Sequence, residues 1–321
     1  MRIAIITPAP PQSRQGNRVT ALRWARILRG VGHHVIVLTQ YDRQRVDLLI
    51  ALHARRSAKS ADSFHRRYPT RPIVVALTGT DLYRDVKTSE AARKSLEIAS
   101  RLILLQPLGI QELPHRLRRK ARVVHQSAEG PKKKPRPLKW VFEVCVLGHL
   151  RPVKDPFRTA LASRLLPPHS RIVVTHLGAA LSDGMAKRAR AEMARNPQYH
   201  WRGEVPRAEA LRILARSRLL VLTSRMEGGA NVISEALAAG VPIVCSRIAG
   251  SVGILGADYP GYFPVGDTRF LAVMLARARS DKRFYRSLKI HCRRCSVLVT
   301  PSRERQTWTS VLRELSNPET T

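Results

Sequence analysis

Short runs of apolar residues recur along the chain, and charged, amphipathic segments separate them. The first six runs lie at residues 2–7, 34–39, 47–52, 72–77, 101–106 and 121–126. Continuous apolar runs of this length are typical of strands buried on both faces of a parallel sheet, because crossover helices cover both faces. The pattern predicts an α/β fold that begins with a Rossmann-like, doubly wound domain at residues 1–127.

A linker interrupts this rhythm at residues 128–140, AEGPKKKPRPLKW, where three Pro and five basic residues show no apolar periodicity. Six further apolar runs lie at residues 142–148, 171–178, 199–203, 218–224, 242–246 and 261–265. We expect a second Rossmann-like domain at 141–299 and a terminal helix at 300–321 that could pack back on the first domain. Two such domains facing a cleft would present the loops at the carboxyl ends of their strands to ligands.

The composition bounds the compartment and the partners. No apolar run approaches the length of a membrane span, and the N-terminus does not look like a signal peptide, so we expect a cytoplasmic protein. Cys145 and Cys245 lie inside apolar runs, whereas Cys292 and Cys295 form a lone CxxC that is either incidental or a metal or redox pair. The net charge of +34 favours anionic ligands, or it reflects an Arg-rich, solvated surface.

The stretch from Ser224 to Val244 carries two carboxylates, Glu227 and Glu235, on either side of Gly228 and Gly229. Asn231 is a plausible N-cap of the helix that follows, and Gly240 is expected to end it. Glu235 would then lie in the first turn, near unpaired backbone N–H groups that attract anions. The alternative is a well-capped connector with no ligand.

A second polar loop, LGHLRPVKDP at 147–156, leaves the first strand of the second domain. His149, Arg151 and Lys154 supply donors and positive charge, which a diphosphate requires. The same residues would also suit a charged surface loop.

These two loops together resemble the nucleotide-sugar domain of retaining family-four glycosyltransferases of the glycosyltransferase-B fold. The match lies in an E-x7-E motif from Glu227 to Glu235, in EALAAGVPIV at 235–244, and in the Lys154 that ends a G-x-x-x-P-x-K loop. The resemblance implies that Lys154 and a neighbouring Arg bind the diphosphate and that Glu235 binds the ribose. It also implies that Glu227, with the four residues after it, binds the sugar and phosphate; these four are Gly228, Gly229, Ala230 and Asn231.

The chain departs from the family in two places. His149 stands where the family has Arg, so either Arg151 replaces that Arg or His149 makes a weaker, pH-dependent contact. The usual Pro-Phe-Gly after the first Glu is replaced by Gly228, Gly229 and Ala230.

Six blocks of sequence are also similar to the selenosugar synthases of selenoneine biosynthesis; they lie at residues 7–28, 49–57, 74–85, 145–158, 227–244 and 255–268. This resemblance implies transfer of a sugar from a UDP-sugar, with UDP-N-acetylglucosamine as the expected donor, to selenophosphate, with formation of a carbon–selenium bond. The catalytic residues would be Glu227, Lys154 and Arg151. Because selenophosphate arrives as a nucleophile, no strong general base is required.

The first domain must then bind a small anion. Its candidate residues are Arg14, Gly16, Asn17, Arg18, His53, Arg55, Arg56, Thr78, Gly79, Thr80, Asp81 and Arg84. Several have a structural alternative: Asn17 as a helix cap, His53 as a satisfied histidine, Arg55 and Arg56 as solvated side chains, and Asp81 as the cap of a helix at 82–86 or as the partner of an Arg.

We expect no metal and no cofactor, because the chain has no Asp-x-Asp motif that would hold Mg²⁺ at a diphosphate. The expected partners are small anionic substrates, without nucleic acid or a required membrane contact. Two other functions stay open. One is a glycosyltransferase with a hydroxyl or lipid-linked acceptor, which a basic first domain could bring to an anionic membrane. The other, a nucleic-acid binder, has only charge in its favour, since aromatic residues make up 5% of the chain.

Overall fold

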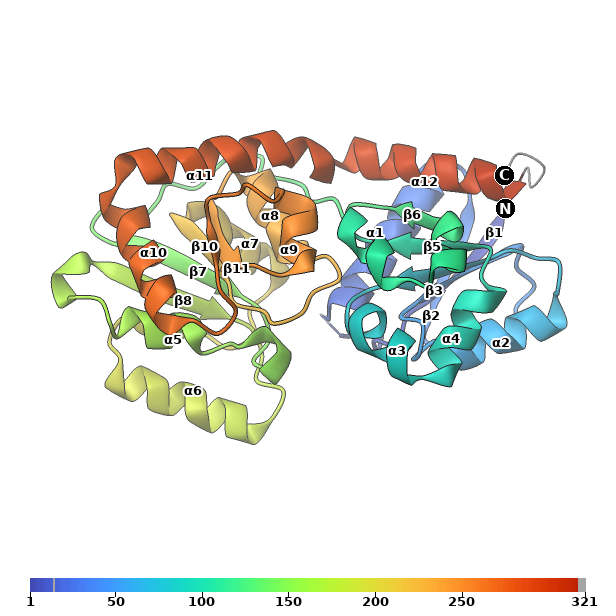
Figure 1. Ribbon diagram of the computed structural model, residues 1–321, viewed down its shortest axis with the longest axis horizontal. Helices are drawn as coiled ribbons and strands as arrows, with labels where there is room; N and C mark the ends of the chain where they lie inside the picture. Colours follow the sequence, from blue (N-terminus) through green and yellow to red (C-terminus); the bar gives the residue numbers. More distant parts are fainter. Residues whose placement is uncertain (14, 317–321) are drawn as a thin grey trace. The chain divides into compact units, whose positions relative to one another are not determined.

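The computed structural model describes residues 1–13 and 15–316, and its contacts divide the chain into two compact units (Figure 1). Unit 1 comprises Met1–Gln126, Glu227–Gly229 and Pro301–Thr321, and unit 2 comprises Ser127–Met226 and Ala230–Thr300. Each unit contains a six-stranded sheet whose paired strands are all parallel. The predicted α/β fold with two Rossmann-like sheets is therefore confirmed.

The sheet of unit 1 has the order β2-β1-β3-β4-β5-β6. Its strands are β1 (Arg2–Ile6), β2 (His34–Leu38), β3 (Leu48–Leu52), β4 (Ile73–Leu77), β5 (Arg101–Leu104) and β6 (Ala121–Val123). The two central strands β3 and β4 are buried at every residue, as expected for strands with helices on both faces. The helical elements are α1 (Gly16–Gly30), α2 (Ala58–Arg67), η1 (Asp81–Asp85), α3 (Val86–Thr88), α4 (Glu90–Ile98), η2 (Pro107–Glu112) and η3 (His115–Lys120).

The terminal helix α12 (Pro301–Ser316) belongs to unit 1 and packs on α1. Trp308 is fully buried and its ring lies edge-on to that of Trp24, with centroids 4.8 Å apart. The Trp24 indole N–H donates to Glu304 at 2.7 Å, and Arg23 donates to the same carboxylate at 3.0 Å. A large aromatic pair and a satisfied buried carboxylate thus hold α12 on the sheet domain.

The sheet of unit 2 has the order β12-β11-β10-β7-β8-β9. Its strands are β7 (Phe142–Leu147), β8 (Ile172–Leu177), β9 (Tyr199–Trp201), β10 (Leu219–Leu222), β11 (Ile243–Ser246) and β12 (Tyr262–Phe263). The helical elements are η4 (Pro152–Lys154), α5 (Arg158–Ser163), η5 (Pro168–Ser170), α6 (Asp183–Arg195), α7 (Arg207–Arg216), α8 (Asn231–Ala239), α9 (Ala249–Leu255), α10 (Thr268–Ser280), α11 (Lys282–Cys295) and η6 (Ser296–Val299). Because β7 and β10 are neighbours, the loops that follow them leave the same edge of the sheet.

Two helix starts differ from the sequence prediction. Asn17 is the second residue of α1, whose N-cap is Gln15, so Asn17 does not cap the helix. Likewise Asn231 is the first residue of α8 and Ala230 is the N-cap. Glu235 is therefore the fifth residue of α8 and lies beyond the first turn. The helix ends as predicted, at Gly240 with φ of 63°, a left-handed conformation that favours glycine.

The four cysteines are free thiols. Cys292 is buried and lies 3.3 Å from the Tyr259 hydroxyl, and Cys295 is half-buried. Residues 1–13 and 15–316 contain no cluster of three or more His, Cys, Asp or Glu side chains that could hold a metal ion. Over the same residues, no helix is long and apolar enough to cross a membrane.

Candidate functional site

In unit 2 the Lys154 loop is tied to the end of β10. The Thr223 hydroxyl donates to the carbonyls of Lys154 and Asp155, both at 2.9 Å, and the Arg225 amide donates to the Val153 carbonyl at 2.9 Å. The backbone of Lys154 is thus fixed beside the segment that leads to Glu227. Asp155 adopts a left-handed conformation, φ 43°, and its carboxylate accepts from Arg158 at 2.9 Å.

The other half of this loop pairs with the loop after β8. The Leu150 amide donates to the Ala179 carbonyl at 2.8 Å, and the Ala179 amide donates to His149 Nδ1 at 3.1 Å. His149 Nδ1 therefore acts as an acceptor in this arrangement. A Cβ on Gly178 would lie 2.1 Å from the Gly148 carbonyl oxygen, so this close approach requires glycine.

His176 supports the loop from within strand β8, a role that the sequence did not suggest. Its Nε2 donates to the Gly148 carbonyl at 3.1 Å, and its Nδ1 accepts from the Tyr199 hydroxyl at 2.9 Å. Burial lowers the pKa of His176 to about 4, so the ring is neutral at pH 7 and this pair of hydrogen bonds fixes its tautomer.

Glu235 is buried, with 7% of its surface exposed, and it pairs with a residue that the sequence analysis did not identify. Arg207, the first residue of α7, contacts Glu235 Oε1 through Nη2 at 2.7 Å. Helices α7 and α8 pack together, which brings this arginine to the carboxylate. The pairing was invisible in the sequence because the two residues are 28 positions apart and nothing local links them.

In unit 1 the buried Asp81 carboxylate joins the loops that follow β3 and β4. It accepts from the amides of Thr78 at 3.0 Å, Gly79 at 2.8 Å and Ala54 at 3.0 Å. Both sequence alternatives for Asp81 are wrong for the part of the chain that the structure describes, because Thr80 is the N-cap of η1 and no described arginine pairs with Asp81. A carboxylate that accepts from backbone amides of two loops holds those loops in one arrangement.

Arginines are held by Asp85 instead. The Asp85 carboxylate accepts from Arg55 Nε at 2.8 Å and from Arg84 Nε at 3.1 Å, and it is nearly fully buried. These two guanidinium groups lower the pKa of Asp85 against the effect of burial. Arg55 and Arg84 are themselves exposed, so each is held at one nitrogen and reaches solvent with the rest of its guanidinium group.

His53 lies between these two carboxylates. It is 3% exposed, has φ of 74°, and its Nε2 is 3.3 Å from the Thr80 hydroxyl. Asp81 and Asp85 are each 3.9 Å from its ring nitrogens. Burial lowers the pKa of His53, and the nearby carboxylates only partly oppose this effect.

At the start of α1, Gly16 is exposed and Asn17 and Arg18 are half-buried. The Arg18 Nε is buried and has no hydrogen-bond partner among the described residues. Arg14 lies outside the described residues, and Arg56 is exposed. The structure thus brings His53, Thr80, Asp81, Arg55 and Arg84 together through the contacts above, none of which involves Gly16, Asn17 or Arg18.

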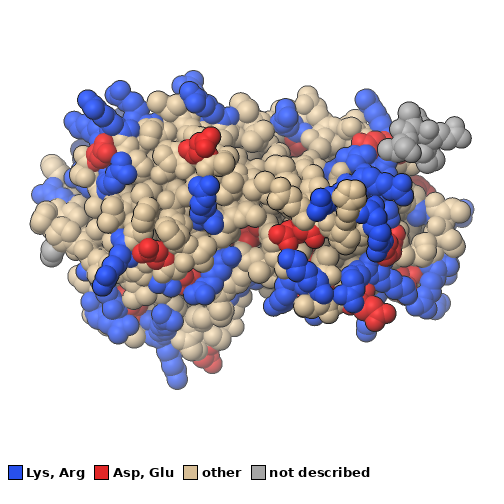
Figure 2. All heavy atoms as spheres, viewed as in Figure 1, with Lys and Arg blue, Asp and Glu red and all other residues tan. Residues whose placement is uncertain are grey.

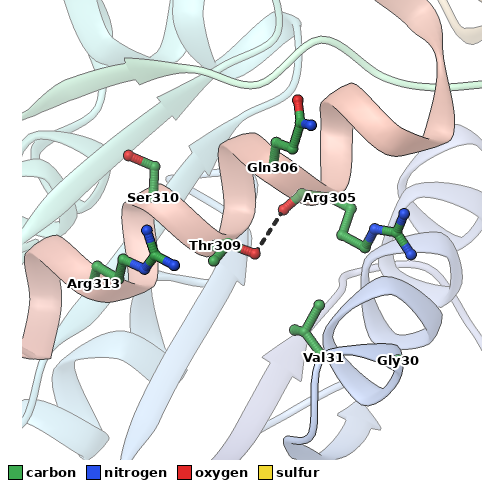
Figure 3. Close-up of a pocket in the computed structure, with 7 residues that line it drawn as sticks. All are labelled: Gly30, Val31, Arg305, Gln306, Thr309, Ser310 and Arg313. Atoms are coloured by element: carbon green, nitrogen blue, oxygen red, sulfur yellow. Dashed lines mark hydrogen bonds between the residues drawn. The ribbon is translucent and has the colours of Figure 1, made fainter.

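A cavity of about 440 Å³ lies elsewhere in unit 1, between α12 and the end of α1 (Figure 3). It is lined by Gly30, Val31, Arg305, Gln306, Thr309, Ser310 and Arg313. Gly16 and Gly30 are the two ends of α1, so the cavity is roughly 20 Å from the candidate residues at the helix start. It contains none of the residues that the sequence predicted for a site.

One part of the chain, which contains the Lys154 loop and the E-x7-E motif, is similar to a known family. The family model of glycosyl transferases group 1 matches residues 131–268, which include Lys154, Glu227 and Glu235. No curated protein matches the sequence.

Solved structures match the fold over 84% to 98% of this chain. Anabaena Alr3699/HepE in complex with UDP and glucose is 16% identical, has a TM-score of 0.77, and the match covers 98% of this chain and 100% of that one. Sucrose-phosphate synthase from Thermosynechococcus elongatus is 16% identical with a TM-score of 0.77 and coverage of 98% and 99%. The α,α-trehalose 6-phosphate synthase from Burkholderia multivorans is 14% identical with a TM-score of 0.68 and coverage of 84% and 70%.

Proposed function

We propose that this chain, a glycosyltransferase with the glycosyltransferase-B fold, transfers a sugar from a UDP-sugar to selenophosphate. The donor in this proposal is UDP-N-acetylglucosamine. The observation that carries the donor half is the group 1 family match, which contains both the Lys154 loop and the E-x7-E motif in residues 131–268. In unit 2, hydrogen bonds from Thr223 and Arg225 hold the Lys154 loop beside the segment that leads to that motif.

The donor site would bind the negatively charged diphosphate of the UDP-sugar with positively charged side chains. Lys154 and Arg151 would bind the diphosphate, with His149 as a further donor through Nε2 because its Nδ1 already accepts from Ala179. Glu235 would accept from the ribose hydroxyls. The similar HepE structure holds UDP and glucose, which supports a UDP-sugar as the donor class here.

The segment after Glu227 would bind the transferred sugar and its phosphate. Gly228, Gly229 and Ala230 have little or no side chain, and Asn231 is the first residue of α8, at a helix start of the kind that attracts anions. In this proposal Glu227 contacts the sugar hydroxyls.

The acceptor half rests on the cationic cluster of unit 1. Asp85 holds Arg55 and Arg84 in place, so two guanidinium groups are already ordered before an anion arrives. His53 and the Thr80 hydroxyl add donors. The Arg18 Nε, which no described residue satisfies, is a further group that a ligand could satisfy. A small, multiply charged oxyanion such as selenophosphate fits this chemistry.

The reaction would proceed at the anomeric carbon. Selenium forms the new bond to carbon, the bond from carbon to the diphosphate oxygen breaks, and UDP leaves with the electron pair of that bond. Lys154 and Arg151 would stabilise the charge that grows on the diphosphate, without a metal ion. The selenium atom is already nucleophilic, so no side chain has to remove a proton.

A transferase with a hydroxyl acceptor is the second candidate. His53 favours this candidate, because its imidazole is buried and neutral and lies 3.9 Å from each of two carboxylates. A neutral histidine beside a carboxylate can act as a general base. In that case His53 would accept the proton of a sugar or lipid-linked hydroxyl.

An acceptor panel tests the proposal. UDP release from UDP-N-acetylglucosamine is measured with selenophosphate, thiophosphate, phosphate or simple sugars as acceptor. The proposal is supported if UDP release requires selenophosphate. The double variant Arg55→Ala with Arg84→Ala should then release UDP more slowly, because its KM for selenophosphate is higher. Release with a hydroxyl acceptor that disappears in His53→Ala supports the second candidate.

A further inference from the structure

A basic surface of unit 2 takes no part in the chemistry above. It consists of the linker segment 131–140 and the exposed face of α11 with the adjoining Val297, and we call it the linker–α11 surface. Two contacts, one at each end of the linker, place it alongside α11 and η6 in antiparallel order. The Ala128 amide donates to the Val299 carbonyl, and the Phe142 ring lies 5.9 Å from that of Tyr285. Between them, burial and then the charge of Lys289 lower the pKa of Lys134.

The charged side chains of the linker segment and of α11 are all cationic. Its exposed cations are Lys132, Lys133, Lys134, Arg136, Lys139, Lys282, Arg283, Arg286, Lys289, Arg293 and Arg294. Residues 130–140 and 282–300 contain no Asp or Glu. Figure 2 shows Lys and Arg side chains gathered along the upper left edge of the molecule, where Figure 1 places α11. Such a surface attracts a polyanion or an anionic membrane.

Large apolar side chains stand among these cations. Trp140 is 76% exposed, and Leu138, Ile290 and Val297 are between 39% and 61% exposed. The opposite face of α11 packs into the core through Phe284, Leu288 and Cys292. The exposed apolar residues are therefore not needed for packing of the helix. Four exposed apolar groups on one cationic surface distinguish it from an ordinary solvated face.

We propose that the linker–α11 surface docks on an anionic lipid bilayer. The cations would contact lipid phosphates, while Trp140, Ile290 and Val297 enter the headgroup region. Nucleic acid would use the cations, but the aliphatic side chains would gain nothing from it, and Trp140 is the only aromatic side chain exposed on this surface. The docking is peripheral, and it does not depend on which acceptor the enzyme uses.

The tryptophans of the chain provide a direct probe. Trp24 and Trp308 are fully buried, and the Trp201 indole N–H donates to the Gly178 carbonyl at 2.8 Å in a partly buried site. Trp140 is therefore the residue whose emission should respond to lipid. We expect a blue shift on addition of vesicles of phosphatidylcholine with 30% phosphatidylglycerol, quenching by brominated lipid, and neither effect with phosphatidylcholine alone.

Co-sedimentation with the same vesicles measures the affinity. Replacing Lys132 and Lys133 by Gln should weaken binding roughly tenfold or more at low salt, since each removes a charge from the surface. Ile290→Ser with Val297→Ser should weaken it several-fold and leave the salt dependence unchanged. All four positions are exposed, so the circular dichroism and the melting temperature should not change.

Matched controls lie on unit 1. Arg45→Gln with Lys59→Gln removes the same charge from exposed positions outside the surface, and Leu22→Ser removes an exposed apolar residue there. These controls should bind vesicles like the unaltered protein, and Trp140→Phe should remove the emission change. Equal loss of binding in the controls, binding to neutral vesicles of equal strength, or a Trp140 response to duplex RNA but not to vesicles would overturn the proposal.

Discussion

Replacement of Glu235 by Ala should raise the KM for the nucleotide sugar about 100-fold and change kcat much less. The carboxylate would accept from two ribose hydroxyls, and hydrogen bonds to a charged group contribute about 1.5–3 kcal/mol each. A combined loss of about 3 kcal/mol corresponds to a factor of about 150 in affinity. The ribose is remote from the bond that changes, so the loss falls on binding.

The fold should tolerate this change. The Arg207 that loses its partner has a side chain that is 51% exposed, so water can solvate it, and pairs of this kind contribute less than about 1 kcal/mol. The stability cost should therefore stay small.

The matched control is Glu143, a second buried glutamate of unit 2. It is 1% exposed and accepts from Arg216 at 2.8 and 2.9 Å. Glu143→Ala should lower the free energy of unfolding by about 3–5 kcal/mol, because it leaves a mostly buried arginine unpaired. It should leave the KM for the nucleotide sugar unchanged.

Steady-state kinetics and inhibition by UDP and by 2′-deoxy-UDP form the assay. The unaltered enzyme should bind UDP more tightly than 2′-deoxy-UDP, and the Glu235→Ala variant should lose that preference. A folded Glu235→Ala protein with an unchanged KM and an unchanged preference would refute the assignment of this carboxylate to the ribose.

Four further predictions concern charge, metal, pH and packing. Lys154→Met should lower kcat about 100-fold in steady-state kinetics, because the diphosphate loses a fixed cation; an unchanged kcat would contradict this role. EDTA should leave the rate unaltered; a loss that Mg²⁺ restores would refute metal independence. Burial lowers the pKa of His176 from 6.5 to about 4, so the unfolded chain binds more protons between these values. Because of this group, the free energy of unfolding should fall by about 3 kcal/mol as the pH is lowered from 6.5 to 4. His176→Gln should make the free energy of unfolding, measured with urea at several pH values, depend less on pH over this range. An equal pH dependence in both proteins would count against the role of His176. Trp308→Ala should lower the free energy of unfolding by about 3–5 kcal/mol in thermal or urea unfolding, and a change under 1 kcal/mol would show that α12 is not held by this residue.

The strands were predictable because burial on both faces demands continuous apolar sequence. The run at 47–52 becomes β3 (Leu48–Leu52) and that at 72–77 becomes β4 (Ile73–Leu77), both fully buried. Helix starts were less predictable. Asn231 suits both a cap and the first helical position, and the conformation of the preceding loop decides between them.

The partners of the candidate site residues could not be predicted. The pair of Arg207 with Glu235 depends on the packing of α7 against α8, and the contact of His176 with Gly148 depends on the pairing of β8 with β7. Asp81 was expected to cap a helix or to hold an arginine, but it is the first residue of η1 and its carboxylate accepts from three backbone amides of two loops instead. These contacts form because of the order of the strands in the sheet and the packing of the helices, and they cannot be predicted from neighbouring residues in the sequence.

The product mass tests the central proposal most directly. The enzyme is incubated with UDP-N-acetylglucosamine and selenophosphate, and the mixture is examined by mass spectrometry. We predict an N-acetylhexosamine that carries one selenium atom at its anomeric carbon, recognised by the selenium isotope pattern, together with an equal amount of UDP. The phosphoryl group of selenophosphate is then found either still on selenium or, after hydrolysis of the phosphorus–selenium bond by water, as inorganic phosphate. Turnover of the donor without any selenium-bearing sugar, or transfer only to a hydroxyl acceptor, would contradict it.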